Sequence, residues 1–426
     1  MYSEEVTRDM NPIYTENHFD LMVRHLTSRH ITAWDETPES VPEFSMRFTD
    51  REQLENERRV ELHLRKFPHS FTAYNDMQEK DQGQLRRRVK SAILRLPFFS
   101  QDFLDDQFFE SSEKATGSFV HAAREFDSSI TENEIHQALR NLWVFNSIQL
   151  MFGEPILCTP SSFAYSLLYP FTDNGLDNAS RTEAEKKALL HWLTQWFERG
   201  ECATPDDLTA KIARLLQMIE EQFPPSEFPD VHNSLFAIHC AQRKSLMLHD
   251  VLPDTDEPGL FAITVEKGGT SVLADGYLVK GQLSITQADI LFAYGVLLQF
   301  VDDLQDLEED GIAGHSNPFS RAMARGQLDN ITCRLIHFGR SCAVMLDELE
   351  SSNNGSIRRM IEGSCTFLIA EAVARQKEFY SRSFLQKFER ATPFRVEYLA
   401  EMKRNMSTQN FQSVRCSVVE NEFSLS

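Results

Sequence analysis

The stretch "ILFAYGVLLQFVDDLQDLEED" (290–310) joins a strongly apolar run to a dense run of acids. Six carboxylates fall within nine consecutive positions, and no lysine or arginine lies among them. The apolar part has helical spacing, and it predicts one long helix over 284–310. On such a helix Asp302, Asp306 and Asp310 lie four residues apart and share one face. The sequence therefore predicts a buried helix that ends in an acidic face.

This acidic face is costly unless a cation binds to it. Like charges four residues apart destabilise a helix, and acids at its C-terminus meet the negative end of the helix dipole. Gly311 and Gly314 place the predicted helix end near Asp310, so both penalties apply. Mg²⁺, which prefers oxygen ligands, would remove them. A solvated acidic surface is the alternative, but the apolar run directly upstream favours a metal site at the mouth of a cavity.

A second acidic pair offers ligands from an opposite wall. "SLLYPFTDNGLDN" (166–178) carries Asp173 and Asp177, four residues apart at the end of another apolar run, with Asn178 adjacent. The rival stretch "DFLDD" (102–106) has similar spacing but lies in polar, loop-like sequence, and we interpret it as surface. Ions bound between two acidic walls would hold a diphosphate and neutralise the charge that develops as it leaves.

Such chemistry also needs basic and aromatic side chains. Arg243 and Lys244 in "HCAQRKSLML" could donate to diphosphate oxygens. In "KGGTSVLAD" (267–275) the glycine pair at 268–269 predicts a helix break that exposes backbone amides and points Lys267 and Thr270 into a cavity. An ordinary turn is the alternative. The 32 phenylalanines are first of all core residues, although aromatic rings also stabilise carbocations.

Composition sets limits on the protein class. With 426 residues and 41% hydrophobic content the chain can bury a large core. A net charge of −21 argues against nucleic acid and against an anionic membrane surface as partners. The N-terminus lacks a signal-peptide pattern, and the longest apolar stretch is too short for a membrane span. Seven scattered cysteines fit reduced thiols. These features predict a soluble, cytoplasmic protein.

Helical periodicity dominates the chain and predicts an all-α protein. One example is 130–152, where Thr131 and Glu134 have the spacing of a capping box. The expected organisation has three parts: a peripheral, partly helical N-terminal extension (1–75), one all-α domain (76–415) and a C-terminal tail (416–426).

Over about residues 130–390 the sequence resembles the class I isoprenoid synthases. "LLQFVDDLQDLEEDGIAGHSNPF" (297–319) resembles their second aspartate-rich motif, with aspartate at all three positions of the metal triad. "DNGLDN" (173–178) differs from the DDxxD of most sesquiterpene synthases and prenyltransferases. Together with "KGGTSVLAD" it is most similar to the bacterial large-terpene synthases, which are related to squalene and phytoene synthases.

The resemblance implies an isoprenoid-synthase-type helical bundle around a central apolar cavity, and three Mg²⁺ ions. The metal ligands it implies are Asp173, Asp177, Asp302, Asp306 and Asp310, of which the first four form the catalytic set. It also implies diphosphate contacts from Arg243 and Lys267, and "ARQKEFY" adds Arg375 and Tyr380, similar to a C-terminal Arg/Tyr pair of terpene synthases. The roles of His315 and Asn317 stay open. The fold is compatible with a homodimer.

The function implied is that of a Mg²⁺-dependent terpene synthase, a carbon–oxygen lyase. It would ionise a long prenyl diphosphate, cyclise or deprotonate the carbocation, and release diphosphate. One alternative is an enzyme that condenses two prenyl units, either of the squalene/phytoene-synthase kind or a polyprenyl transferase. The other is a non-catalytic helical binding protein whose acidic face meets a basic partner.

Overall fold

The computed structural model describes residues 18–44, 47–64, 106–177, 181–200, 202–249, 257–308, 316–349 and 354–408. Within these ranges every regular element is a helix and no strand is present, which confirms the predicted all-α class. The helices and their bounds are α1 (His18–Asp35), α2 (Asp50–Leu64), α5 (Asp106–Phe126), α6 (Glu132–Met151), α7 (Pro160–Asp177), α8 (Glu183–Arg199), α9 (Asp207–Gln222), α10 (Pro229–His249), α11 (Glu257–Lys280), α12 (Ile285–Gln305), α14 (Pro318–Ala324), α15 (Asp329–Met345), η1 (Leu346–Glu348), α16 (Asn354–Arg375), η2 (Lys377–Phe379), α17 (Arg382–Glu389) and α18 (Val396–Thr408).

Local sequence fixes where several helices begin. At the start of α6, Thr131 Oγ1 accepts a hydrogen bond from the Glu134 amide at 3.2 Å, and Glu134 Oε2 accepts from the Thr131 amide at 2.8 Å. This is the capping box that the sequence predicts. Thr182 and Ser284 cap α8 and α12 in the same way. A cap of this kind stabilises a helix by about 1 kcal/mol.

The sequence analysis predicted that the glycine pair 268–269 breaks the helix. This prediction is wrong, because α11 continues through both residues. Its glycines serve close packing against α12 instead. A Cβ at Gly268 would lie 2.5 Å from Gln299 Cβ, and one at Gly269 would lie 2.2 Å from the Phe292 ring. The Thr270 hydroxyl donates to the Glu266 carbonyl at 2.6 Å and is thus bonded to its own helix. The backbone amides of this segment remain inside the helix.

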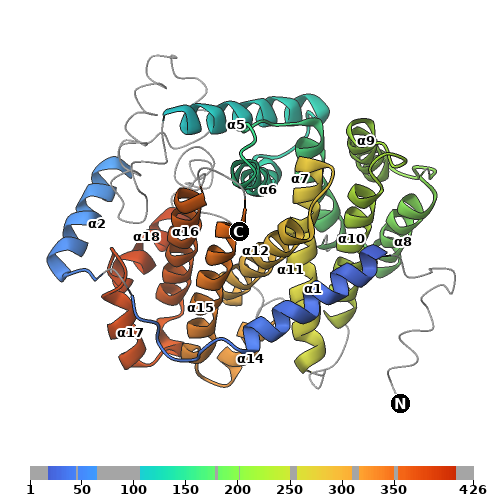
Figure 1. Ribbon diagram of the computed structural model, residues 1–426. Coiled ribbons are helices and arrows are strands. Elements are labelled where there is room, and N and C mark those ends of the chain that lie inside the picture. Colours follow the sequence, from blue (N-terminus) through green and yellow to red (C-terminus); the bar gives the residue numbers. More distant parts are fainter. Residues whose placement is uncertain are drawn as a thin grey trace.

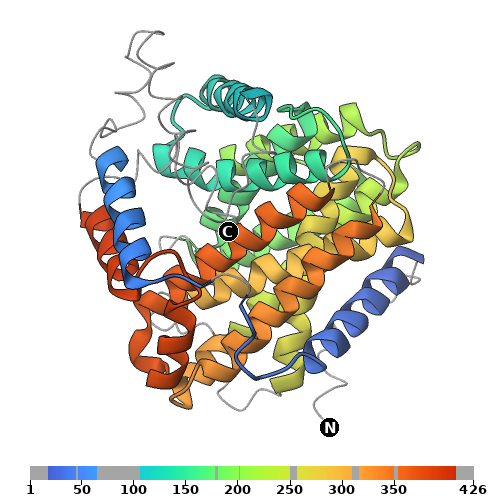
Figure 2. The ribbon, with the colours of Figure 1, turned by 60° about the vertical axis from the view of Figure 1, so that its left-hand side comes forward.

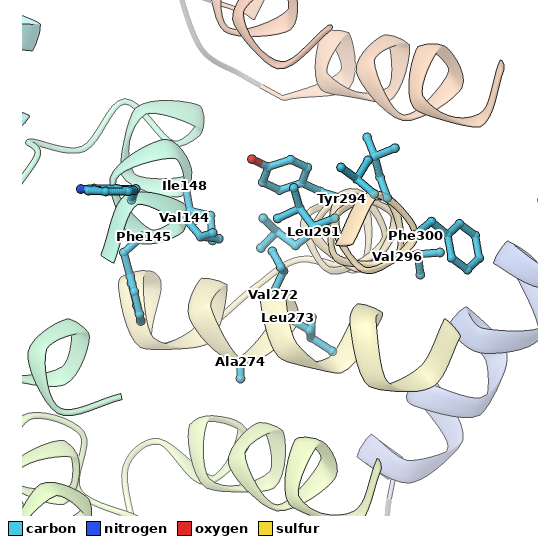
Figure 3. Packing of buried hydrophobic residues seen from close by; sticks show 14 of the residues in the cluster. Val144, Phe145, Ile148, Val272, Leu273, Ala274, Leu291, Tyr294, Val296 and Phe300 are labelled. Atoms are coloured by element: carbon cyan, nitrogen blue, oxygen red, sulfur yellow. The ribbon is translucent and has the colours of Figure 1, made fainter. Parts of the chain in front are cut away.

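The helix α12 runs through the centre of the bundle, with α11 against it (Figure 1). Of the described helices it alone is long and apolar enough to cross a membrane, and 72% of that stretch is buried within the fold. Figure 3 shows apolar residues on several sides of α12, including Leu291, Val296 and Phe300, next to residues of α6 and α11. Its position in the core accounts for its hydrophobicity.

The N-terminal helices pack on opposite parts of the bundle (Figures 1 and 2). Along α11, Phe19 of α1 contacts Tyr277 and Trp34 contacts Phe261, with ring centroids 5.5 and 5.8 Å apart. α2 lies beside α17 and α18, where Glu57 bonds Arg395 (Oε2 to Nη2, 2.6 Å). The predicted boundary after residue 75 and the tail from 416 lie outside the described residues, so that division stays a prediction.

Candidate functional site

The acidic run begins where α12 ends. The sequence predicts a helix through Asp310, but α12 stops at Gln305 with Asp306 as its C-cap. The Asp306 amide still donates to the Asp302 carbonyl at 2.9 Å, so these two residues remain one helical turn apart. The backbone is helical again at Leu307 and Glu308. The break at Asp306 agrees with the repulsion among the acids, which opposes a continuous helix. Asp310 lies outside the described residues.

The three described aspartates of this segment have different surroundings. Asp302 is 34% exposed at its side chain, and its Oδ1 accepts from Arg140 Nη2 at 3.1 Å. Asp303 is buried and accepts from Gln299 Nε2 at 2.7 Å. Asp306 is half-buried. The end of α12 therefore offers carboxylates at the boundary between the core and the surface.

Arg140 is a site residue that the sequence analysis missed. It lies on α6, and its guanidinium reaches across the bundle to a residue 162 positions later in the chain. The available signal was weak: between Glu134 and Met151 it is the sole Lys, Arg, Asp or Glu in a largely apolar helix. A charge isolated on a buried helix generally has a partner, because burying it alone is costly.

The first acidic motif lies at the same end of the bundle. α7 runs antiparallel to α6, as the pairs Asn141–Ser166 (Nδ2 to Oγ, 3.4 Å) and Phe145–Tyr165 (ring centroids 6.1 Å apart) show. The C-terminal end of α7 therefore lies near the first half of α6, which includes Arg140. Asp173 and Asp177 lie in the last two turns of α7. Their side chains are outside the described set, so only their place in the backbone is established.

Two of the predicted diphosphate contacts lie on α10 and α11. Lys267 is half-buried on α11 and, within the described residues, makes no ion pair. Arg243 of α10 donates to the Thr194 hydroxyl of α8 at 3.3 Å, and His239 Nε2 lies 2.9 Å from that same hydroxyl. Burial, and secondly the charge of Arg243, lower the pKa of His239 to about 3, so this imidazole is neutral. The structure thus directs Arg243 toward α8, while Lys267 on α11 has no ion pair with any of the residues that the structure describes.

The predicted pair Arg375 and Tyr380 is divided between two surroundings. The end of α16 lies beside the end of α12, because Gln305 Nε2 donates to Glu371 Oε2 at 3.1 Å. Arg375 follows one turn later, partly buried, and its Nε has no hydrogen-bond partner among the described residues. Tyr380 is packed against α15 and α17: its hydroxyl lies 2.9 Å from the Thr332 hydroxyl.

The remaining residues near the motif have local roles. Asn317 caps α14, since its Oδ1 accepts from the Ser320 amide at 2.8 Å. His315 lies outside the described residues. Among the side chains that the structure describes, no three imidazole, thiolate or carboxylate groups are close enough to hold a metal ion. Three of the five predicted ligands are not in that set, and the carboxylates that are described have the all-oxygen chemistry that suits Mg²⁺.

Comparison with known proteins adds little to this geometry. No known protein family matches the sequence, and no curated protein matches it. Among solved structures, the geranylgeranyl pyrophosphate synthetase from Pyrococcus horikoshii aligns with 79% of this chain and 93% of its own, at 14% identity and a TM-score of 0.28. These values are below the range that indicates a shared fold. A functional assignment must therefore rest on the residues of this chain.

Proposed function

We propose that this protein is a Mg²⁺-dependent terpene synthase of the isoprenoid-synthase type, which ionises a long prenyl diphosphate at the end of α12 and cyclises or deprotonates the resulting cation. The observation that carries the proposal is the meeting of Asp302 with Arg140 at the end of a buried apolar helix. The acidic end of α7 lies at that same end of the bundle. Carboxylates and a cation are thus gathered beside an apolar interior.

The residues divide into two groups by their chemistry. Asp302 and Asp306, with Asp173, Asp177 and Asp310, would hold three Mg²⁺ ions. Bound Mg²⁺ would supply positive charge to the departing diphosphate. Arg140 and Lys267 would donate charge-assisted hydrogen bonds to diphosphate oxygens. In that arrangement Arg140 exchanges its bond to Asp302 for bonds to the ligand.

The interior of the bundle would hold the hydrocarbon. Most buried residues of α6, α11 and α12 are apolar, and such surroundings would keep out water, which would otherwise capture a carbocation. Aromatic rings in this core, such as Phe145 and Phe292, offer the negative faces that attract a cation. The apolar environment accordingly favours a hydrocarbon product over an alcohol.

The test is to incubate purified protein and Mg²⁺ with single prenyl diphosphates, from geranyl to heptaprenyl, and to measure both released diphosphate and extracted hydrocarbon. We expect release and a defined hydrocarbon from one substrate alone. A product that forms only when a second prenyl diphosphate is added would assign a condensing enzyme instead. No release across the whole series by folded protein would contradict enzymatic function and favour a helical binding protein.

A further inference from the structure

A polar cluster lies within the apolar core, on helices that also form the candidate site. The core polar cluster consists of Asp275 of α11, Asn141 of α6, Ser166 of α7 and Tyr294 of α12. Asn141 Nδ2 lies 3.4 Å from Asp275 Oδ1 and 3.4 Å from Ser166 Oγ. Asp275 and Ser166 have no exposed surface, and Tyr294 is 3% exposed. In Figure 3 the Tyr294 ring extends from α12 toward α6.

The carboxyl of Asp275 holds a polar atom that the described residues leave unsatisfied, because its Oδ2 has no hydrogen-bond partner among them. A buried polar atom without a partner costs about 1–3 kcal/mol, so this one needs a reason.

The carboxyl of Asp275 is completely buried. Burial raises its pKa well above the usual range, and the hydrogen bond from Asn141 opposes this only in part. Burial likewise raises the pKa of Tyr165 and Tyr294, so both phenols keep their protons. Burial therefore favours the protonated form of Asp275. A carboxyl whose pKa is strongly shifted beside a candidate site is a recurrent feature of proton-transfer residues.

The cluster is connected to the candidate ion site through α6. Two consecutive residues of that helix make the connection. Arg140 bonds Asp302 in the candidate ion site, and Asn141 bonds Asp275 in the core polar cluster. Along α12, Tyr294 precedes Asp302 by eight residues, which is about 12 Å at the α-helical rise. A prenyl chain whose diphosphate is bound at the end of α12 would extend into the core toward this cluster.

We propose that Asp275 exchanges a proton with the hydrocarbon chain during the reaction; this inference rests on the proposed function. The Asp275 O–H bond breaks as the π electrons of a double bond form a new C–H bond, which leaves a carbocation and a carboxylate. The carboxylate then takes a proton from a carbon next to the cation, and a double bond forms there. The acid is regenerated, and no oxidant or further reactant is consumed.

The experiment follows solvent deuterium into the product. Wild-type protein is equilibrated in D₂O and given the active prenyl diphosphate with Mg²⁺, and released diphosphate and the hydrocarbon mass are measured together. We expect wild-type hydrocarbon to carry solvent deuterium. Asp275→Asn should still release diphosphate but give hydrocarbon without the label and with a changed product pattern. Ser234→Ala is the control, because this buried hydroxyl bonds only the Val231 carbonyl of its own helix.

The outcomes separate the two proposals. If the wild type releases no diphosphate, the proposed function fails and this inference fails with it. If release is normal but wild-type hydrocarbon carries no label, or Asp275→Asn retains the label, Asp275 is not the proton-transfer residue and the proposed function stands. Should Asp275→Asn not fold, Asp275→Ser, which buries a smaller polar group, provides the same comparison, and the wild-type label still decides the question.

Discussion

The substitution Arg140→Met tests whether Arg140 serves to bind a ligand or to stabilise the fold. Two unit charges at the Arg140–Asp302 separation of 3.1 Å attract by about 5 kcal/mol in a partly solvated site. Desolvation and side-chain ordering offset most of this, so an ion pair with both members about one-third exposed adds about 0.2–1 kcal/mol to stability. We therefore expect Arg140→Met to lower the free energy of unfolding by no more than about 1 kcal/mol.

Activity should respond much more strongly than stability. A hydrogen bond to a charged group contributes about 1.5–3 kcal/mol when its partner cannot be replaced by water. If Arg140 bonds the departing diphosphate, kcat/KM should fall by about 10- to 150-fold, at 1.36 kcal/mol per factor of ten. Arg140→Lys keeps the charge without the planar fork and should be intermediate.

The assay is diphosphate release over a range of substrate concentrations, with urea unfolding of the same preparations. Full activity in Arg140→Met would refute the assignment of this residue to the site. A loss of stability above about 3 kcal/mol would also refute this assignment. It would show that Arg140 and Asp302 form a buried structural ion pair, which Arg140 cannot give up for a ligand.

Three further predictions test the packing, the charges and the ion site. Gly269→Ala should lower the urea midpoint and the free energy of unfolding by about 1–3 kcal/mol, because the new Cβ would meet the Phe292 ring. Gly117 has open space around it, so Gly117→Ala should be neutral or stabilising. The pKa of His239 is about 3 in the fold and 6.5 when unfolded, so the unfolded state binds the extra proton. Stability should therefore fall as pH drops below 6.5, by up to about 1.4 kcal/mol per pH unit. His239→Gln should flatten this slope, and an unchanged slope would contradict the assignment to His239. Mg²⁺ should raise the melting temperature of the wild type, since it binds the native state, and should do so less in Asp302→Asn; equal shifts would place the ion elsewhere.

Local signals in the sequence predicted the helices and some of their ends. The capping residues Thr131 and Glu134 act within one turn, so their pattern is sufficient to start α6. The glycine pair 268–269 misled because glycine permits two opposite outcomes, a break or a close helix contact, and the partner helix decides between them. Only the neighbouring Phe292 shows that contact was the reason for glycine here.

The candidate site was predictable only where its residues are close in sequence. The spacing of Asp302 and Asp306 follows from one helix, and the apolar run before them indicates burial. The Arg140–Asp302 pair depends on how two distant helices pack, which no local pattern reports. The same holds for Asp275: in the sequence it lies within an ordinary helical segment, and its proximity to Asn141 arises from the tertiary structure.

The most direct measurement compares Asp302→Asn with Glu308→Gln, two variants that each remove one negative charge from the same acidic run. Asp302 is half-buried and bonded to Arg140, whereas Glu308 is exposed. With Mg²⁺ and a prenyl diphosphate that the wild type turns over, the account predicts that Asp302→Asn loses diphosphate release while remaining folded, and that Glu308→Gln keeps it. Equal activity in the two variants would show that the end of α12 is a solvated acidic surface and not the reaction site.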